Sequence, residues 1–244
     1  MDWKQEIVLC RDVAAIVGPV GGRAATTPAS GRLLYDFVLH NRCGRVLELG
    51  FAHGNSTCYM AAALDELGGG SILTIDREAA RLREPNIIEL LAATGLAKYV
   101  EPIFAQSSYN WELLGLLERQ RDGHTTRPLF DFVFVDGAHT WETDGLAFVL
   151  ADKLLRPGGW ILFDDIHWTI AASKAASGRR PTTVIDPAER VPQVGRVFAL
   201  LVMQHPNYER FEVHGNWGWA RKRRTRQEEA LPEQAVSRLY ETHS

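Results

Sequence analysis

Val46-Leu-Glu-Leu-Gly-Phe-Ala-His-Gly-Asn-Ser-Thr57 joins an apolar strand to the start of a helix through a turn that holds two glycines. Because glycine lacks a Cβ, Gly50 and Gly54 permit a tight turn and the close approach of a ligand. The backbone amides that begin the next helix, near Asn55 and Ser56, face the same crevice. The spacing is Gly-x-x-x-Gly and not the Gly-x-Gly-x-x-Gly of a pyrophosphate site, which argues against a dinucleotide ligand.

From Arg45 onward the chain alternates buried strands with helical stretches. The expected strands are Val46–Leu49, Ser71–Ile75, Val100–Phe104, Phe132–Val135 and Trp160–Phe163. The expected helices are 28–39, which Thr27 and Pro28 begin, and then 56–67, 79–95, 108–121, 142–155 and about 193–204. Two more strands, Phe211–His214 and Trp217–Arg221, are joined by the turn signal Gly215-Asn216. The pattern predicts an α/β fold: a Rossmann-like doubly wound sheet, mostly parallel with a C-terminal antiparallel hairpin, and helices on both faces.

We expect residues 1–244 to form a single domain with its core at 28–223. Within residues 1–27 we expect a helix at 5–17 and then a mobile, glycine-rich loop. Residues 166–194 contain several prolines and no clear period, which favours a long loop or lid over the strand ends. Residues 227–244 have the composition of a polar helical tail.

The composition is that of a soluble globular protein, with 45% hydrophobic and 23% charged residues among 244 and a formal net charge of -3. This charge gives no general attraction to nucleic acid, and no apolar stretch approaches the roughly 20 residues that span a bilayer. The N-terminus lacks the apolar core of a secretory signal, and the three scattered cysteines fit a reducing compartment. We therefore expect a cytoplasmic protein, either a monomer or a homo-oligomer.

Acidic side chains follow two of the central strands. Asp136 comes directly after Phe132–Val135, and the pair Asp164 and Asp165 comes after Trp160–Phe163. Ligands of open parallel sheets bind outside the carboxyl ends of the strands, and three carboxylates there repel one another unless a cation joins them. This is a metal-site hypothesis. The simpler interpretation is that Asp136 begins an ordinary turn and that the pair caps a helix.

Another acid, Asp76, closes the second strand, some twenty residues past the glycine turn. A carboxylate at this place can accept both hydrogen bonds from a ribose diol. The alternative is that Asp76 only caps the next helix and that the glycines only reverse the chain.

The run Glu48-Leu-Gly-Phe-Ala-His-Gly-Asn-Ser-Thr, followed by Asp76, resembles the first two motifs of class I S-adenosylmethionine-dependent methyltransferases, over about residues 28–223. The resemblance implies that the glycine turn binds the methionine part of the cofactor and that Asp76 binds its ribose. It implies that Glu48 orders the turn or contacts the amino acid moiety, and that the loop after the third strand lies along the adenine. The cofactor-binding residues that it suggests are Glu48, Gly50, Phe51, Gly54, Asn55, Ser56, Asp76, Gln106, Ser107 and Asp136.

A narrower resemblance is to metal-dependent O-methyltransferases of the catechol type and the sugar and antibiotic-tailoring group, which carry acids at the positions of Asp136, Asp164 and Asp165. It implies that these three residues bind Mg²⁺ or another divalent cation, which suits hard oxygen ligands. His139 stands three residues after Asp136, where the catechol-type enzymes have a lysine base, and histidine can take that role near neutral pH. His167 is a competing base.

The sequence thus predicts an S-adenosylmethionine-dependent, Mg²⁺-assisted O-methyltransferase that acts on a hydroxyl of a small molecule such as a phenol, catechol, sugar or natural product. One alternative is a metal-independent class I methyltransferase for another small-molecule nucleophile. Another is a non-catalytic binding module that uses the basic run 221–226 on nucleic acid. A solvated edge explains this run more simply, so we do not expect nucleic acid as a partner.

Overall fold

The structure is a computed structural model that describes residues 26–177 and 186–224. The helix predicted at 5–17, nearly all of the glycine-rich loop that follows it, and the tail at 227–244 lie outside the described residues. Within the described ranges, no helix is long and apolar enough to cross a membrane.

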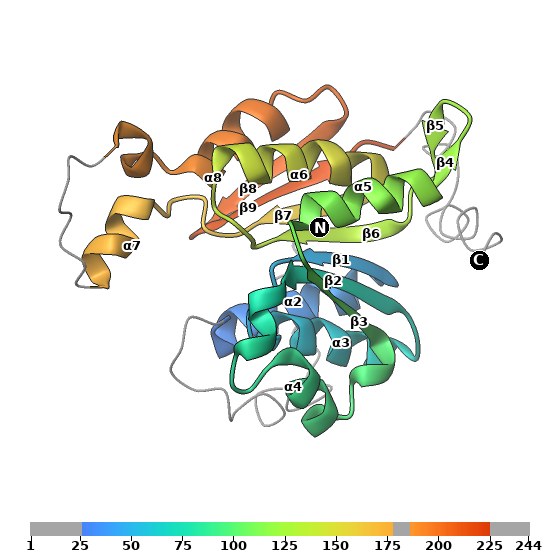
Figure 1. Ribbon diagram of the computed structural model, residues 1–244. Coiled ribbons are helices and arrows are strands. Elements are labelled where there is room, and N and C mark those ends of the chain that lie inside the picture. The colour runs from blue at the N-terminus through green and yellow to red at the C-terminus, as the bar shows by residue number, and fades with distance from the viewer. Residues whose placement is uncertain (1–25, 178–185, 225–244) are drawn as a thin grey trace. The chain divides into compact units, whose positions relative to one another are not determined.

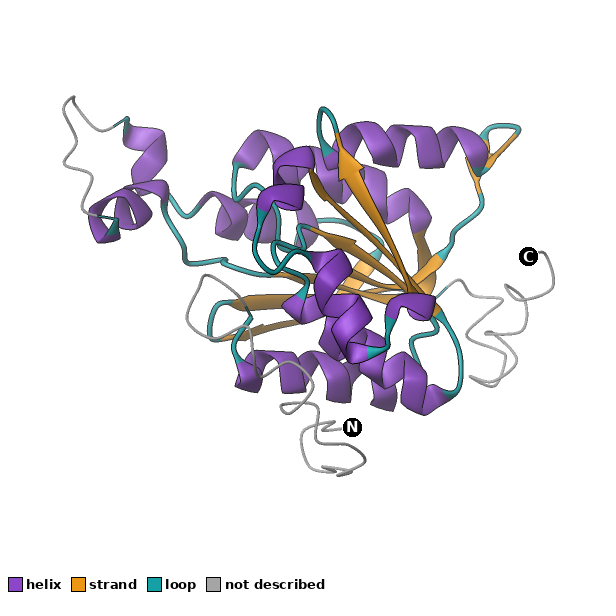
Figure 2. Ribbon diagram, turned by 60° about the horizontal axis from the view of Figure 1, so that its bottom comes forward, coloured by secondary structure: helices purple, strands orange, loops and turns teal. Residues whose placement is uncertain are grey.

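Seven strands form one sheet in the order β3-β2-β1-β6-β7-β9-β8 (Figure 1). Figure 2 shows the strands in orange and the helices in purple. The seven strands are β1 (Arg45–Leu49), β2 (Ser71–Arg77), β3 (Val100–Ala105), β6 (Phe130–Val135), β7 (Leu155–Phe163), β8 (Tyr208–His214) and β9 (Trp217–Lys222). β1 pairs in parallel with β2 and β6, and β2 with β3. β9 pairs antiparallel with both β7 and β8. The predicted sheet and its C-terminal hairpin are confirmed. A second hairpin of β4 (Arg121–Asp122) and β5 (Thr125–Thr126) was not predicted.

The α-helices are α2 (Pro28–His40), α3 (Asn55–Leu67), α4 (Ile87–Thr94), α5 (Tyr109–Arg119), α6 (Trp141–Leu154), α7 (Ile170–Ala176) and α8 (Gln193–Val197). α2 begins as predicted, because the Thr27 side chain accepts a hydrogen bond from Ser30 N–H and Pro28 opens the first turn. α8 continues as a π-helical turn, Phe198–Val202. Short 3-10 helices lie at Glu78–Leu82, Ala97–Tyr99 and Pro187–Arg190.

The single helix predicted over 79–95 is wrong. The chain instead forms the 3-10 helix Glu78–Leu82 and then α4, which begins only at Ile87. Pro85 interrupts the helical pattern, and Asn86 begins a new helix by a capping box with Glu89, in which each side chain accepts from the other's backbone N–H.

The segment 166–194 is more regular than the predicted loop. It contains α7, which Thr169 caps by accepting a hydrogen bond from Ala172 N–H, and the 3-10 helix Pro187–Arg190. Lys174 and Glu189 form an ion pair at 2.6 Å between these two helices. The alanines of Ile170–Ala176 are strong helix formers, and this local propensity exceeds the effect of the prolines further on.

By its internal contacts the chain divides into two compact units, so the single domain stays a prediction. The first holds the described residues up to 116 together with 132–138. Within it, Leu49 at the end of β1 lies opposite Ile75 of β2 and Val135 of β6. The residues that follow these three therefore lie side by side at the same edge of the sheet.

The second unit holds residues 117–131 and the described residues from 139 onward. Its core includes Phe163 of β7, whose ring lies 6.3 Å from that of Phe148 in α6 and 6.1 Å from that of Phe198. Phe163 also lies opposite Gly218 of β9 in the antiparallel pair. The turn before β9 is therefore brought beside the residues that follow β7.

Candidate functional site

The glycine turn of the first unit has no room for a side chain at Gly50. This residue has φ +91°, and a Cβ there would lie 2.0 Å from the carbonyl oxygen of Asp136. Asp136 N–H donates to Leu49 O, and Gly50 N–H donates to Ile75 O, each at 2.8 Å. The turn is thus set directly against Ile75 of β2 and Asp136, which follows β6.

The turn ends at Gly54, which has φ +96° and precedes the first residue of α3. Asn55 follows it and is only 6% exposed. Its Oδ1 atom has no hydrogen-bond partner among the described residues. Because buried acceptors are nearly always satisfied, this oxygen fits a donor group on a ligand in the turn.

Glu48 lies fully buried beneath the same turn. Its carboxylate accepts hydrogen bonds from the hydroxyls of Ser56 and Thr57 at 2.5 Å and of Thr74 at 2.6 Å. Burial raises the pKa of Glu48 from 4.5 to about 7, and these hydroxyls oppose the rise. Of the two predicted roles for Glu48, this geometry favours the ordering of the turn, since no part of the side chain reaches the surface.

Asp76 reaches from β2 to the glycine turn. Its Oδ2 accepts hydrogen bonds from Phe51 N–H at 3.1 Å and Ala52 N–H at 2.8 Å, and its Oδ1 accepts from Arg77 N–H. The structure therefore brings together the two motifs that are about twenty residues apart in sequence. Binding of a ribose by Asp76 stays a prediction.

The loop after β3 carries Gln106 and Ser107, and both are exposed. Beside it lies an aromatic pair that sequence reasoning missed, in which the rings of Phe51 and Phe104 meet edge to face at 5.3 Å. The guanidinium of Arg81 lies 3.8 Å from the centre of the Phe104 ring. The only hint in the sequence is Phe51, a large apolar residue inside a turn of otherwise small or polar ones.

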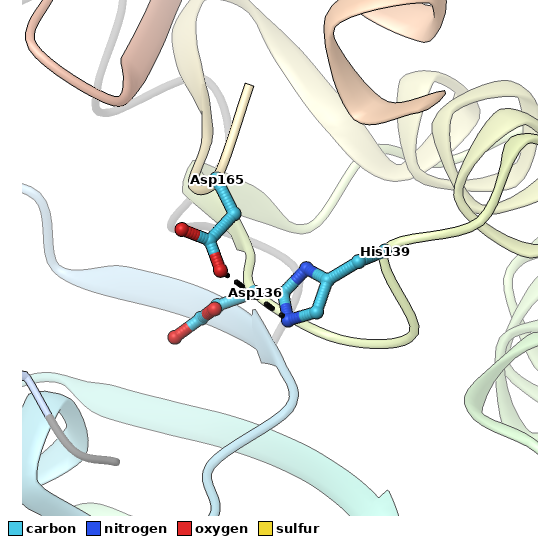
Figure 3. A group of neighbouring side chains, drawn as sticks. All are labelled: Asp136, His139 and Asp165. Carbon is cyan, nitrogen blue, oxygen red and sulfur yellow. Dashed lines mark ion pairs between the residues drawn. The ribbon is translucent and has the colours of Figure 1, made fainter. Parts of the chain in front are cut away.

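Asp136, His139 and Asp165 form a group in which one potential ligand atom of each lies within 4.8 Å of the others (Figure 3). The Nε2 atom of His139 lies 3.6 Å from Oδ2 of Asp165. His139 and Asp165 both have left-handed backbones, with φ +56° and +57°. Non-glycine residues in this conformation carry strain that persists only where the surroundings hold them, which is common at functional sites.

Asp164, which the predicted metal set joins with Asp136 and Asp165, is not part of this group, and metal binding by these three residues stays a prediction. Its Oδ1 accepts a hydrogen bond from Asp165 N–H at 2.6 Å, and its side chain also bonds that of Trp217. Burial, followed by the charge of Asp165, raises the pKa of Asp164 to about 6.

Asn216, in the turn between β8 and β9, is a site residue that sequence reasoning missed. Its Nδ2 donates to Oδ1 of Asp165 at 2.6 Å, and its Oδ1 accepts from His167 N–H at 3.1 Å. Its carbonyl oxygen accepts from Ile166 N–H at 3.0 Å. The sequence shows Gly215-Asn216 only as a turn, and the pairing of β7 with β9 is needed to place it here. The side chain of His167, the competing base, is exposed.

The donor set of this group suits a divalent cation. Two carboxylates supply hard oxygen ligands, which fit Mg²⁺, and an imidazole nitrogen beside them also suits Mn²⁺ or other transition metals. The arrangement can equally serve acid–base chemistry, because the carboxylate of Asp165 lies close enough to His139 to orient its ring.

The basic run 221–226, which begins in β9, bonds the protein's own backbone. Arg221 donates to Gly158 O at 3.0 Å, Lys222 to Leu155 O at 3.1 Å, and Arg223 to Tyr208 O at 3.1 Å. The expected edge position is wrong for Arg221 and Lys222, because β9 lies between β7 and β8 in the sheet. Residues 225 and 226 lie beyond the described part of the chain.

Residues 47–166 match the model of a family described as a methyltransferase domain. This range runs from the first strand through the glycine turn, Asp76, Asp136 and Asp165. Together with the sheet order found here, the match supports the resemblance of the sequence to class I methyltransferases. No curated protein matches the sequence significantly.

Solved structures of the same fold include three with bound cofactor or its product. TomG, an O-methyltransferase of tomaymycin synthesis from Streptomyces achromogenes in complex with S-adenosylmethionine, is 23% identical with TM-score 0.58, over 86% of this chain and 87% of that one. An O-methyltransferase from Bacillus cereus with S-adenosylhomocysteine is 21% identical with TM-score 0.59, over 89% and 94%. The Podospora anserina methyltransferase PaMTH1, also with S-adenosylhomocysteine, is 16% identical with TM-score 0.60, over 90% and 91%. At these identities the similarity concerns the fold.

Proposed function

We propose that this methyltransferase transfers the methyl group to a hydroxyl of a small molecule with the help of a divalent cation. The observation that carries the proposal is the group of Asp136, His139 and Asp165 at the carboxyl ends of the strands. The description of TomG and of the Bacillus cereus protein as O-methyltransferases supports the choice of oxygen as acceptor.

In this proposal the cofactor lies over the glycine turn. The unpartnered Oδ1 of Asn55 and the space that Gly50 leaves fit the polar methionine end of S-adenosylmethionine. Asp76 gives up its bonds to the turn amides in part and accepts from the ribose. The exposed Gln106 and Ser107 lie along the adenine, with Phe51 as an apolar neighbour.

Asp136 and Asp165 hold the cation, and His139 accepts the proton of the acceptor hydroxyl. When bound, the cation supplies charge that lowers the pKa of that hydroxyl and fixes its orientation. The acceptor oxygen then attacks the methyl carbon in line with the carbon–sulfur bond. A carbon–oxygen bond forms, the carbon–sulfur bond breaks, and its electron pair neutralises the sulfonium. Positioning supplies much of the rate in such a transfer, which fits a site held by neighbouring strands.

A chelator experiment tests the metal. The protein is dialysed against EDTA and assayed for methyl transfer from labelled S-adenosylmethionine to a panel of catechols, phenols and sugar hydroxyls, with and without added Mg²⁺. We expect activity only with the metal. Asp136→Asn is expected to reduce turnover about 100-fold or more while binding S-adenosylhomocysteine normally, because it removes an ionic ligand and keeps the size of the side chain. Asp122→Asn, at an exposed acid in β4, is the matched control.

One observation favours a second candidate, a metal-independent methyltransferase. Asp164 is already bonded to Asp165 N–H and to Trp217, and His139 lies close enough to Asp165 for the carboxylate to support the histidine as a base without a cation. Full activity after chelation, lost in His139→Gln, would support this candidate and contradict a role for metal.

A further inference from the structure

Tyr109 is the first residue of α5 and is only 5% exposed, although it directly follows the exposed loop after β3. None of the sequence motifs includes it. In the structure its phenol ring lies against the short loop Asp136–His139, and both belong to the first compact unit as far as Ala138.

Two contacts join Tyr109 to this loop. Ala138 N–H donates a hydrogen bond to the phenol oxygen at 3.2 Å. Gly137 packs on the ring so closely that a Cβ there would lie 2.5 Å from Cε1 and 2.8 Å from the phenol oxygen. The ring is buried and cannot move aside easily, so its position fixes the path of the loop backbone.

The loop is short and is held at its start by the hydrogen bond from Asp136 N–H to Leu49 O. It ends at His139, whose left-handed backbone requires support from its surroundings. Once Asp136 is fixed at one end, the bond at Ala138 decides the direction in which the chain enters His139. The contacts of Tyr109 therefore act on the two residues of backbone that join Asp136 to His139.

We propose that Tyr109 is a positioning residue: its phenol holds Gly137 and Ala138 so that Asp136 and His139 present their side chains together. Its effect on metal binding rests on the function proposed above. Its effect on the loop does not.

Tyr109→Phe removes the hydroxyl and keeps the ring. Amide hydrogen exchange of the peptide that contains residues 136–140 is expected to quicken severalfold, since the Ala138 amide loses its acceptor. The affinity for Mn²⁺, used as a paramagnetic probe and measured by water-proton relaxation, is expected to fall about fivefold, as for the loss of one neutral hydrogen bond. S-adenosylhomocysteine should bind as in the natural protein. The control is Tyr99→Phe, which removes the bond from another buried tyrosine to Asp65, with no contact to the loop.

A second pair of variants tests the packing. Gly137 does not have a left-handed backbone, and the three atoms nearest to a Cβ there all belong to Tyr109, so Gly137→Ala is expected to weaken Mn²⁺ binding on the order of tenfold. Gly69→Ala, where a Cβ would meet nothing within 4 Å, is its control. In the double variant Gly137→Ala with Tyr109→Leu, part of the affinity lost in Gly137→Ala should return, because the smaller side chain removes the clash.

The results separate the two ideas. The positioning role is wrong if Tyr109→Phe leaves the amide exchange rates of residues 136–140 unchanged. It is also wrong if Gly137→Ala and Tyr109→Leu change these exchange rates additively in the double variant. If the natural protein binds no Mn²⁺, the proposed metal fails, and the exchange rates still decide whether Tyr109 holds the loop.

Discussion

The substitution Glu48→Gln should change how the stability of the protein depends on pH. The Glu48 carboxyl is fully buried, and its pKa is raised from 4.5 to about 7, chiefly by burial. Since one pKa unit corresponds to about 1.36 kcal/mol, the ionised form lowers the free energy of unfolding by on the order of 3 kcal/mol.

The direction of the effect follows from the order in which the two states lose the proton. Below pH 4.5 Glu48 is protonated in the folded and unfolded states, and it contributes no pH dependence. Between pH 4.5 and 7 the unfolded state ionises first, so a rising pH favours unfolding. Above pH 7 both states are ionised, and the full penalty is present.

A glutamine side chain at this position would keep the contacts without the charge. Its amide oxygen can accept from Thr57 and Thr74, which share one oxygen of Glu48, and its amide nitrogen can donate to Ser56. We therefore expect the free energy of unfolding of Glu48→Gln, relative to the natural protein, to rise by about 3 kcal/mol between about pH 4.5 and about pH 8. Urea unfolding at several pH values measures this difference. Glu101→Gln, at an exposed position of β3, is the control. If the free energy of unfolding changes with pH by the same amount in Glu48→Gln and in the natural protein, the reasoning is refuted.

Three further substitutions test the two halves of the site. Asp76→Ala should weaken S-adenosylhomocysteine binding by about 10-fold to 100-fold in calorimetry, because it removes a charged acceptor, while turnover at saturating cofactor falls less. Gly50→Ala should lower the unfolding temperature and abolish cofactor binding, since the Cβ would meet Asp136 O at 2.0 Å; normal binding by a folded variant would contradict the geometry. Asn216→Ala should weaken Mn²⁺ binding about fivefold and leave the affinity for S-adenosylhomocysteine unchanged, because it frees Asp165 and not the glycine turn. Equal losses in both affinities would show a general loss of structure.

Much of the fold could be predicted because its strands are short apolar runs. Val46–Leu49 and Phe132–Val135 are apolar on both faces except for Glu48, and such runs are typical of buried parallel strands. The predicted helix boundaries were wrong where a few neighbouring residues determine whether a helix forms. The proline and capping box before Ile87 divide a stretch that looks like one helix, and the alanines of Ile170–Ala176 form a helix inside a predicted loop.

The sequence predicted only those parts of the candidate site whose positions follow from the pairing of the parallel strands. Gly50 and Asp136 follow the ends of β1 and β6, and Asp76 lies near the end of the neighbouring β2, so the register brings the three to one edge of the sheet. The distinction between Asp164 and Asp165 depends on a left-handed residue and on a bond to Trp217, and neither has a signature in the sequence. The positions of the charges in the sequence therefore do not distinguish Asp164 from Asp165.

The left-handed residues show why the supporting contacts matter. His139 and Asp165 each adopt a conformation that costs non-glycine residues about 1 to 3 kcal/mol. In both cases a residue far along the chain bonds the same loop: Tyr109 bonds Ala138 next to His139, and Asn216 bonds Asp165 itself. A glycine at either position would relieve the strain and remove the functional side chain. The strain therefore arises because a histidine and a carboxylate stand where the chain must turn. The bonds from Tyr109 and Asn216 stabilise these strained loops, and only the tertiary fold supplies them.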